Sequence, residues 1–182
     1  MGFDWSAAAG TLEVATALER LDLLADPVAE VVRSLGDDRV GATEIDPELA
    51  DTAAFCEKYG SPLERSANCV VVAGKRSGEV RYAACVVLAT TRADVNGVVK
   101  RRLDVRKASF APMDEAVSLT GMEYGGITPF GLPDPWPILI DARVAEAGAV
   151  VVGSGLRRSK IITPADVLTE LPGAELLEDL AR

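Results

Sequence analysis

The residues best suited to chemistry lie in the run LTGMEYGGITPFGLPDPWPILID, which spans 119–141. Gly125 and Gly126 would let backbone N–H groups approach a ligand closely, and prolines at 129, 133, 135 and 137 restrict the path of the chain. An apolar strand then ends in the carboxylate of Asp141. This pattern is typical of a rigid binding loop, although a structural crossover would show the same glycines and prolines.

The lack of histidine in the sequence excludes several mechanisms at once. It removes the imidazole general base, the Ser–His and Cys–His nucleophile pairs and His-containing metal sites. Cys56, Cys69 and Cys85 have no C-x-x-C spacing, which argues against a disulfide framework and a zinc ribbon. We therefore expect free thiols, no metal, no cofactor and a cytoplasmic protein. Cys69, in an apolar strand, is better explained as a structural thiol than as a nucleophile.

The 119–141 run resembles the YbaK/EbsC family of aminoacyl-tRNA editing domains, which also occur attached to prolyl-tRNA synthetases. Members carry a run close to TGxxxGG[IV][ST]P[FL]G and then a strand ending in ID, and residues 120–131 and 138–141 match both. Upstream, DTAAFCEKYGSPLERSANCVVV (51–72) is similar to the family's helix, turn and first core strand. Downstream, VVVGSGLRRSKIITPADVL (150–168) is similar to its closing hairpin and last helix.

The resemblance implies a fold and a division of the chain. We expect a single α+β domain over 26–182, with a central mixed β-sheet surrounded by helices. Apolar residues at helical spacing from Thr11 to Ala25 predict an added N-terminal helix, so that 1–25 would be an extension. A chain of 182 residues fits one domain with a substantial core.

The resemblance also implies roles for individual residues. Editing domains hydrolyse the ester that joins a wrong amino acid to the terminal ribose of tRNA, and positioning with oxyanion stabilisation can drive this reaction. We expect backbone N–H groups around Gly126 to bind the ester carbonyl or the terminal adenosine, and Asp141 to accept a hydrogen bond from the substrate's α-ammonium group. Asp141 could instead be a turn cap after its strand. The other predicted substrate-binding residues are Gly125, Ile127, Thr128, Pro129, Phe130, Gly131, Ser154 and Gly155.

One position departs from the family pattern. Members place a lysine just inside the first core strand, in a run like AK[ST]LVF, where this chain reads ANCVVV with Asn68. The nearest lysine along the chain, Lys75, lies in GKRSG, which predicts an exposed hairpin turn. An amide can donate a hydrogen bond but supplies no charge. We expect Asn68 to orient water or a ribose hydroxyl, the alternative being that it only caps the strand.

The net charge of −9 is unusual for a protein that binds tRNA, because cationic surfaces supply much of the affinity for nucleic acids. Basic residues gather in two clusters, at 100–107 and at 157–160, and either could be ordinary solvated surface. We expect weak contact between these clusters and the 3′ end of an aminoacyl-tRNA, and no DNA or membrane partner. The oligomeric state stays open.

Local signals predict the remaining elements. Helices are expected at 26–36, 51–60, 94–103, 113–120 and from 163, and strands at 40–45, 70–72, 80–89, 105–110, 138–140, 149–152 and 160–162.

Two functions are compatible with these patterns. The first is a free-standing deacylase of mischarged tRNA, with tRNA-Pro carrying Ala, Ser or Cys the leading candidates by resemblance. The second is a non-catalytic relative that binds an aminoacyl ester or a tRNA 3′ end without cleaving it, and Asn68 keeps this second reading open.

Overall fold

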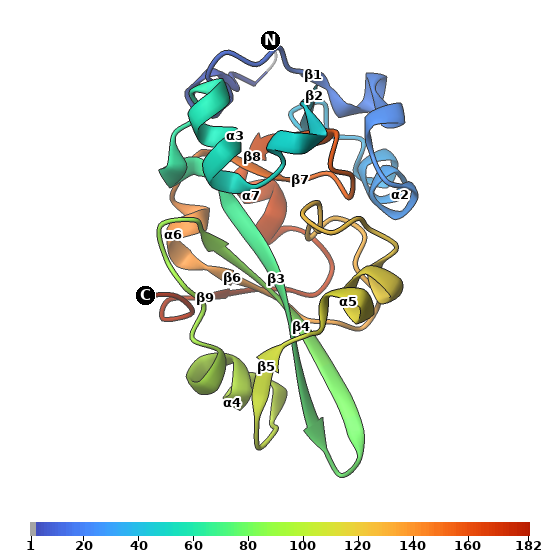
Figure 1. Cartoon of the computed structure of the whole chain (residues 1–182), viewed down its shortest axis with the longest axis vertical. Coiled ribbons are helices and arrows are strands. Elements are labelled where there is room, and N and C mark those ends of the chain that lie inside the picture. The colour runs from blue at the N-terminus through green and yellow to red at the C-terminus, as the bar shows by residue number, and fades with distance from the viewer. Residues whose placement is uncertain (1–2) are drawn as a thin grey trace.

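Two β-sheets organise residues 3–182, the part of the chain that the computed structural model describes (Figure 1). The larger sheet has the strand order β5 (Ala108–Phe110), β3 (Ala67–Arg76), β4 (Glu79–Leu88), β6 (Ile138–Asp141) and β9 (Ala174–Leu177). The smaller sheet has the order β1 (Ala15–Thr16), β2 (Gly41–Glu44), β8 (Ser159–Pro164) and β7 (Ala149–Gly153). The predicted α+β class is confirmed, with a second sheet that we did not predict.

The five-stranded sheet is mixed, as predicted. β3 pairs antiparallel with β4 and β5, whereas β6 runs parallel to both β4 and β9. β3 and β4 form a long hairpin whose register runs from Ala67 opposite Leu88 to Arg76 opposite Glu79. At its turn Ser77 and Gly78 have φ of 52° and 82°, the left-handed backbone that matches the twist of a two-residue hairpin. The predicted GKRSG turn is therefore confirmed.

The N-terminal segment is not the helix that we predicted. Between Thr11 and Ala25 the chain forms β1 and two single 3₁₀ turns, Ala17–Glu19 and Leu21–Leu23. β1 pairs antiparallel with β2, and the leucines of this segment pack against the main core. Successive 3₁₀ turns repeat every three residues, which places apolar side chains at nearly the spacing of an α-helix. The periodicity was genuine, but tertiary pairing determined the structure.

Short helices cover the sheets. They are α1 (Ser6–Ala9), α2 (Asp26–Leu35), α3 (Thr52–Tyr59), α4 (Lys100–Leu103), α5 (Met113–Thr120), α6 (Ala142–Ala145) and α7 (Ala165–Thr169). The predicted helices at 26–36, 51–60 and 113–120 correspond to α2, α3 and α5. The one predicted at 94–103 is divided into a π-helical turn, Val95–Val99, and α4.

The two sheets meet where a parallel bridge joins Ser66, just before β3, to Val151 of β7. Around this junction the largest apolar cluster packs α2, β7 and β8 against Met122 and Phe130. Among residues 3–182 no helix has the length and apolar character needed to cross a membrane.

Asp141 fixes the end of β6 to the C-terminal segment. Its Oδ1 accepts the Arg143 N–H at 2.9 Å, at the start of α6, and its Oδ2 accepts the buried Ala181 N–H, also at 2.9 Å. The side chain is only 1% exposed. Asp141 thus holds three segments together through a buried carboxylate.

We expect Asp141→Ala to lower the free energy of unfolding by about 2 kcal/mol, because two backbone donors would lose a charged acceptor. Urea unfolding followed by circular dichroism measures this change. Asp38→Ala, at an exposed aspartate, is the matched control. Equal stability of the two variants would contradict the structural role of Asp141.

Candidate active site

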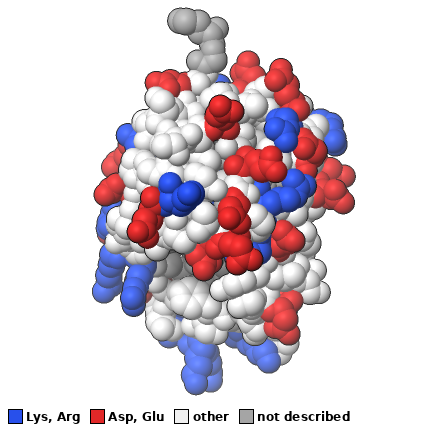
Figure 2. All heavy atoms as spheres, turned by 45° about the horizontal axis from the view of Figure 1, so that its top comes forward, with Lys and Arg blue, Asp and Glu red and all other residues white. Residues whose placement is uncertain are grey.

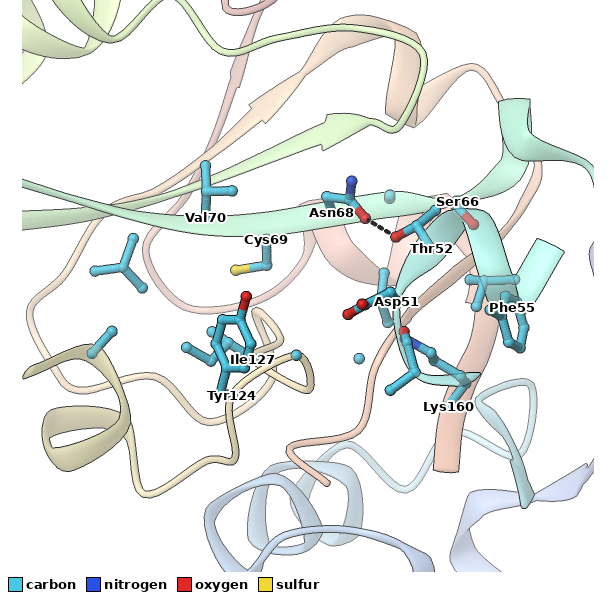
Figure 3. Close-up of a pocket in the computed structure, with 18 of the residues that line it drawn as sticks. Asp51, Thr52, Phe55, Ser66, Asn68, Cys69, Val70, Tyr124, Ile127 and Lys160 are labelled. Carbon is cyan, nitrogen blue, oxygen red and sulfur yellow. Dashed lines mark hydrogen bonds between the residues drawn. The ribbon is translucent and has the colours of Figure 1, made fainter. Parts of the chain in front are cut away.

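A cavity of about 480 Å³ opens beside the junction of the two sheets, between β3, α3, α5 and the loop that follows α5 (Figure 3). It has two chemically different ends. The polar end is formed by Asp51, Thr52, Ser66, Asn68 and Lys160. The apolar end is formed by Val70, Phe110, Met113, Tyr124 and Ile127. Such a cavity has the size and the mixed lining of a small-molecule site.

Lys160 is the cation of this cavity. It lies on β8 between Thr43 of β2 and Gly153 of β7, and is 8% exposed. Its Nζ donates to the Ala50 carbonyl at 3.0 Å and lies 5.4 Å from the centre of the Phe55 ring. An ammonium group has three donors, and within residues 3–182 the Ala50 carbonyl is the only hydrogen-bond acceptor that Nζ meets. The other donors can therefore serve a ligand.

Burial lowers the pKa of Lys160 to about 8. Arg157 adds to this lowering by repulsion, whereas Asp51 and Cys56 oppose it. The charged form of a lysine is disfavoured away from water, and here no carboxylate of the described chain lies within salt-bridge distance to compensate fully. At neutral pH the group is still mostly protonated, close to the point where it loses its charge.

Asp51 supplies a carboxylate to the same end. It precedes α3, yet its side chain makes no capping hydrogen bond. Figure 3 shows its oxygens directed into the cavity from the start of that helix. In the described part of the chain it forms neither a salt bridge nor a side-chain hydrogen bond, so the carboxylate is free to accept one from a ligand.

Asn68 lines the cavity at its edge. Its Oδ1 accepts the Thr52 hydroxyl at 3.0 Å. In Figure 3 its amide nitrogen lies on the other side of β3 from Tyr124 and Ile127, whereas Cys69 points toward them. This arrangement follows from the alternation of side chains along a strand. The structure therefore gives Asn68 a bond to α3 rather than a central place in the cavity.

Cys69 is poorly suited to nucleophilic attack. Burial raises the pKa of its thiol well above the usual range, and the thiolate is the reactive form. All three cysteines are free thiols in the structure, and none has a histidine partner in this sequence. Cys69 thus contributes shape to the cavity wall.

The glycine loop lies over the cavity, but Gly126 does not have the role we predicted. Gly125 and Ile127 line the cavity. The Gly126 N–H instead donates to Glu123 O at 2.9 Å, and its carbonyl accepts the Gly155 N–H at 2.7 Å. A Cβ on Gly126 would lie 2.9 Å from the Leu156 backbone nitrogen. Gly126 is therefore needed for contact between two loops, and its N–H is not free for a substrate.

The other predicted binding residues support the loop from behind. Thr128, Pro129, Phe130, Ser154 and Gly155 are buried, and none lines the cavity. The Ser154 hydroxyl bonds the Ser159 hydroxyl at 2.7 Å, and Gly131 packs against the backbone of Pro27. Asp141 is also remote from the lining and is occupied by backbone donors, so it is the structural cap that was its alternative reading.

Sequence reasoning missed Lys160, Asp51, Phe110 and Tyr124. Lys160 had been grouped with Arg157 and Arg158 as a basic surface cluster, but the structure separates the three. Arg158 bonds the Asp22 carbonyl, and Arg157 bonds the carbonyls of Tyr124 and Pro47. A signal was present, because a lysine inside the otherwise apolar and uncharged run SKIIT is unusual in a buried strand.

Three solved structures share this fold. One, described as a candidate trans-editing enzyme for prolyl tRNA synthetase, has a TM-score of 0.72 and 19% identity, covering 85% of this chain and 94% of that chain. A hypothetical protein has a TM-score of 0.74 and 20% identity, with coverage of 86% and 100%. A scaffold protein from computational epitope grafting has a TM-score of 0.72 and 19% identity, with coverage of 85% and 95%.

These identities are low enough that the similarity concerns the fold alone. The family pattern of the aminoacyl-tRNA editing domain matches residues 46–171, which contain α3, β3, the glycine loop and β8. The match covers the greater part of the chain and every segment that forms the cavity. The chain therefore belongs to the aminoacyl-tRNA editing domain family.

Proposed function

We propose that this protein hydrolyses the ester between a wrong amino acid and the 3′ end of a tRNA, and does so in the cavity between β3 and β8. The observation that carries the proposal is the pairing of a free carboxylate and a free ammonium group at one end of that cavity. The substrate class is supported by the family match.

The substrate is proposed more narrowly from resemblance. tRNA-Pro carrying Ala, Ser or Cys is the leading candidate, and one structural neighbour is described in connection with prolyl tRNA synthetase. A separate editing site for such small amino acids is useful, because one methylene or hydroxyl gives a synthetase only about 1–3 kcal/mol of discrimination. The proposed location is the cytoplasm.

The two charged groups suit the two charges of the reaction. The Asp51 carboxylate would accept the substrate's α-ammonium group, the task that we had given to Asp141. Water then adds to the ester carbonyl carbon, negative charge develops on the carbonyl oxygen, and the bond to the ribose oxygen breaks as that oxygen takes up a proton. The Lys160 ammonium group would stabilise the developing oxyanion. The N–H groups of Gly125 and Ile127, which meet no acceptor within residues 3–182, are further donors for the same oxygen.

Asn68 would act through a neighbour. Its bond to the Thr52 hydroxyl fixes the first residue of α3, directly after Asp51. We therefore propose that Asn68 is a positioning residue, and that Lys160 supplies the charge that Asn68 does not carry.

The competing proposal is a pocket that binds an aminoacyl ester without cleaving it. The specific observation in its favour is Asn68, which replaces the lysine of the family pattern and turns its amide away from the glycine loop. Lys160 argues for hydrolysis, because a buried ammonium group with free donors is costly to keep unless it is used.

We expect the wild-type protein to deacylate at least one member of a panel of mischarged tRNAs, and Lys160→Met to be slower by about a hundredfold, the typical loss for one oxyanion donor. Release of labelled amino acid measures the rate. Lys58→Met, at an exposed lysine of α3, is the control and should match the wild type. A wild type that binds but never cleaves would establish the non-catalytic function, and full activity of Lys160→Met would remove Lys160 from the mechanism.

The pH dependence should follow the protonation of Lys160. Only the protonated form stabilises an oxyanion, so the enzymatic rate should be highest below pH 8 and fall as pH rises through about 8. The uncatalysed hydrolysis of the ester rises with pH and must be subtracted. In Lys160→Arg, where the guanidinium stays charged, the decline should move to higher pH. The same decline in both proteins would assign it to the substrate's amino group instead.

A further inference from the structure

The charges of this protein are distributed unevenly. Residues 75–110 contain nine Lys and Arg against three Asp and Glu, a net charge of +6, whereas the rest of the chain carries −15. The structure gathers this segment at one end, because β5 pairs with β3 and brings Ala108 opposite Gly74. In Figure 1 this is the lower end, with the β3–β4 turn and α4. Figure 2 shows basic side chains projecting from that end and most acidic ones above it.

Much of this positive charge is uncompensated. Arg76 and Arg81 share Asp104, and Arg102 pairs with Glu175. In the described structure, no carboxylate lies within salt-bridge distance of five other cations, which we call the basic end: Lys75, Lys100, Arg101, Arg106 and Lys107. A solvated surface laced with ion pairs would not leave so many cations of one sign together.

The basic end leads directly to the cavity. β5 begins one residue after Lys107 and ends at Phe110, which lines the apolar end. At the strand rise of about 3.3 Å per residue, Lys107 lies roughly 10 Å along the chain from Phe110. Phe110, Met113 and Tyr124 are 61%, 52% and 53% exposed, and we call these three side chains the apolar mouth. Large apolar side chains exposed at a cavity rim mark a contact surface.

We propose that the apolar mouth and the basic end form one continuous track for the single-stranded 3′ end of tRNA, and so fix its direction in the cavity. The terminal adenine would lie against the mouth, the preceding phosphates would follow β5 toward the basic end, and the amino acid would reach the polar end with Asp51 and Lys160. This inference rests on the proposed function for the identity of the RNA. Aromatic faces that stack on bases, beside cations that follow the backbone, are the usual means of binding a single strand.

The track can be tested by binding alone, without hydrolysis. The probe is a fluorescent single-stranded RNA with the 3′ sequence of tRNA-Pro, titrated with full-length protein at several salt concentrations and followed by anisotropy. We expect Arg106→Glu with Lys107→Glu to reduce the slope of log affinity against log salt by about 2, one for each lost phosphate contact. Arg33→Glu with Lys58→Glu changes the net charge equally at exposed sites on α2 and α3, and should leave the slope near the wild-type value.

The apolar mouth has its own variant. Phe110→Ala should weaken RNA binding about tenfold, a typical loss for one stacked base, whereas Leu119→Ala, an exposed leucine of α5 outside the cavity lining, should not. Circular dichroism checks that each variant is folded.

Equal slopes for the two charge-reversal pairs, or no binding of RNA by a protein that deacylates tRNA, would overturn the track. RNA binding with the expected slopes but without hydrolysis would support the track and overturn the proposed reaction. The two proposals can therefore fail separately.

Discussion

The close backbone contact between the loop after α5 and the turn between β7 and β8 is the constraint on which the site depends. The Gly155 N–H bonds the Gly126 carbonyl, and the Glu123 N–H bonds the Gly155 carbonyl at 2.8 Å. A side chain on Gly153 would collide with the carbonyl oxygens of Gly126 and Ile127. Because the β7–β8 turn leads into β8, this contact sets the glycine loop and Lys160 on opposite walls of one cavity. The same turn packs against Ala25 and Val28, so α2 supports it from behind.

The cavity shows how a family site can change its charged group while the backbone is retained. The first core strand offers an amide where relatives carry a lysine, and a cation reaches the cavity from β8 in the other sheet. Keeping an ammonium group at 8% exposure has an energetic cost, which appears as a pKa lowered to about 8. The Ala50 carbonyl and the Phe55 ring offset part of that cost. A lysine held near its titration point is suited to chemistry at neutral pH.

Local signals in the sequence predicted the elements that depend on local physics. The Gly36, Gly60 and Gly121 helix ends, the Ser77–Gly78 turn and the apolar strands β6 and β7 all correspond to patterns within a few residues. The division into two sheets could not be read in this way, because it depends on pairing between distant segments, such as β2 with β8. The N-terminal segment failed for the same reason, since its structure is decided by β2.

The site was predictable only as a region. Motif resemblance identified the glycine loop and the strand of Asn68, and both border the cavity. It could not separate residues that face the cavity from residues that hold the loop in place, because Gly125 and Gly126 look alike in sequence and differ only in what their backbones contact. Lys160 and Asp51 were missed since they are 109 positions apart and meet only in the folded chain.

The most direct measurement is a crystal structure of the protein with a non-hydrolysable analogue, in which an amide replaces the ester between alanine and the terminal adenosine. Our account predicts the analogue's carbonyl oxygen within hydrogen-bond distance of Lys160 Nζ, its α-ammonium group beside Asp51, and its adenine against Phe110 and Tyr124. An analogue bound outside the cavity, or one whose carbonyl oxygen points away from Lys160, would contradict it.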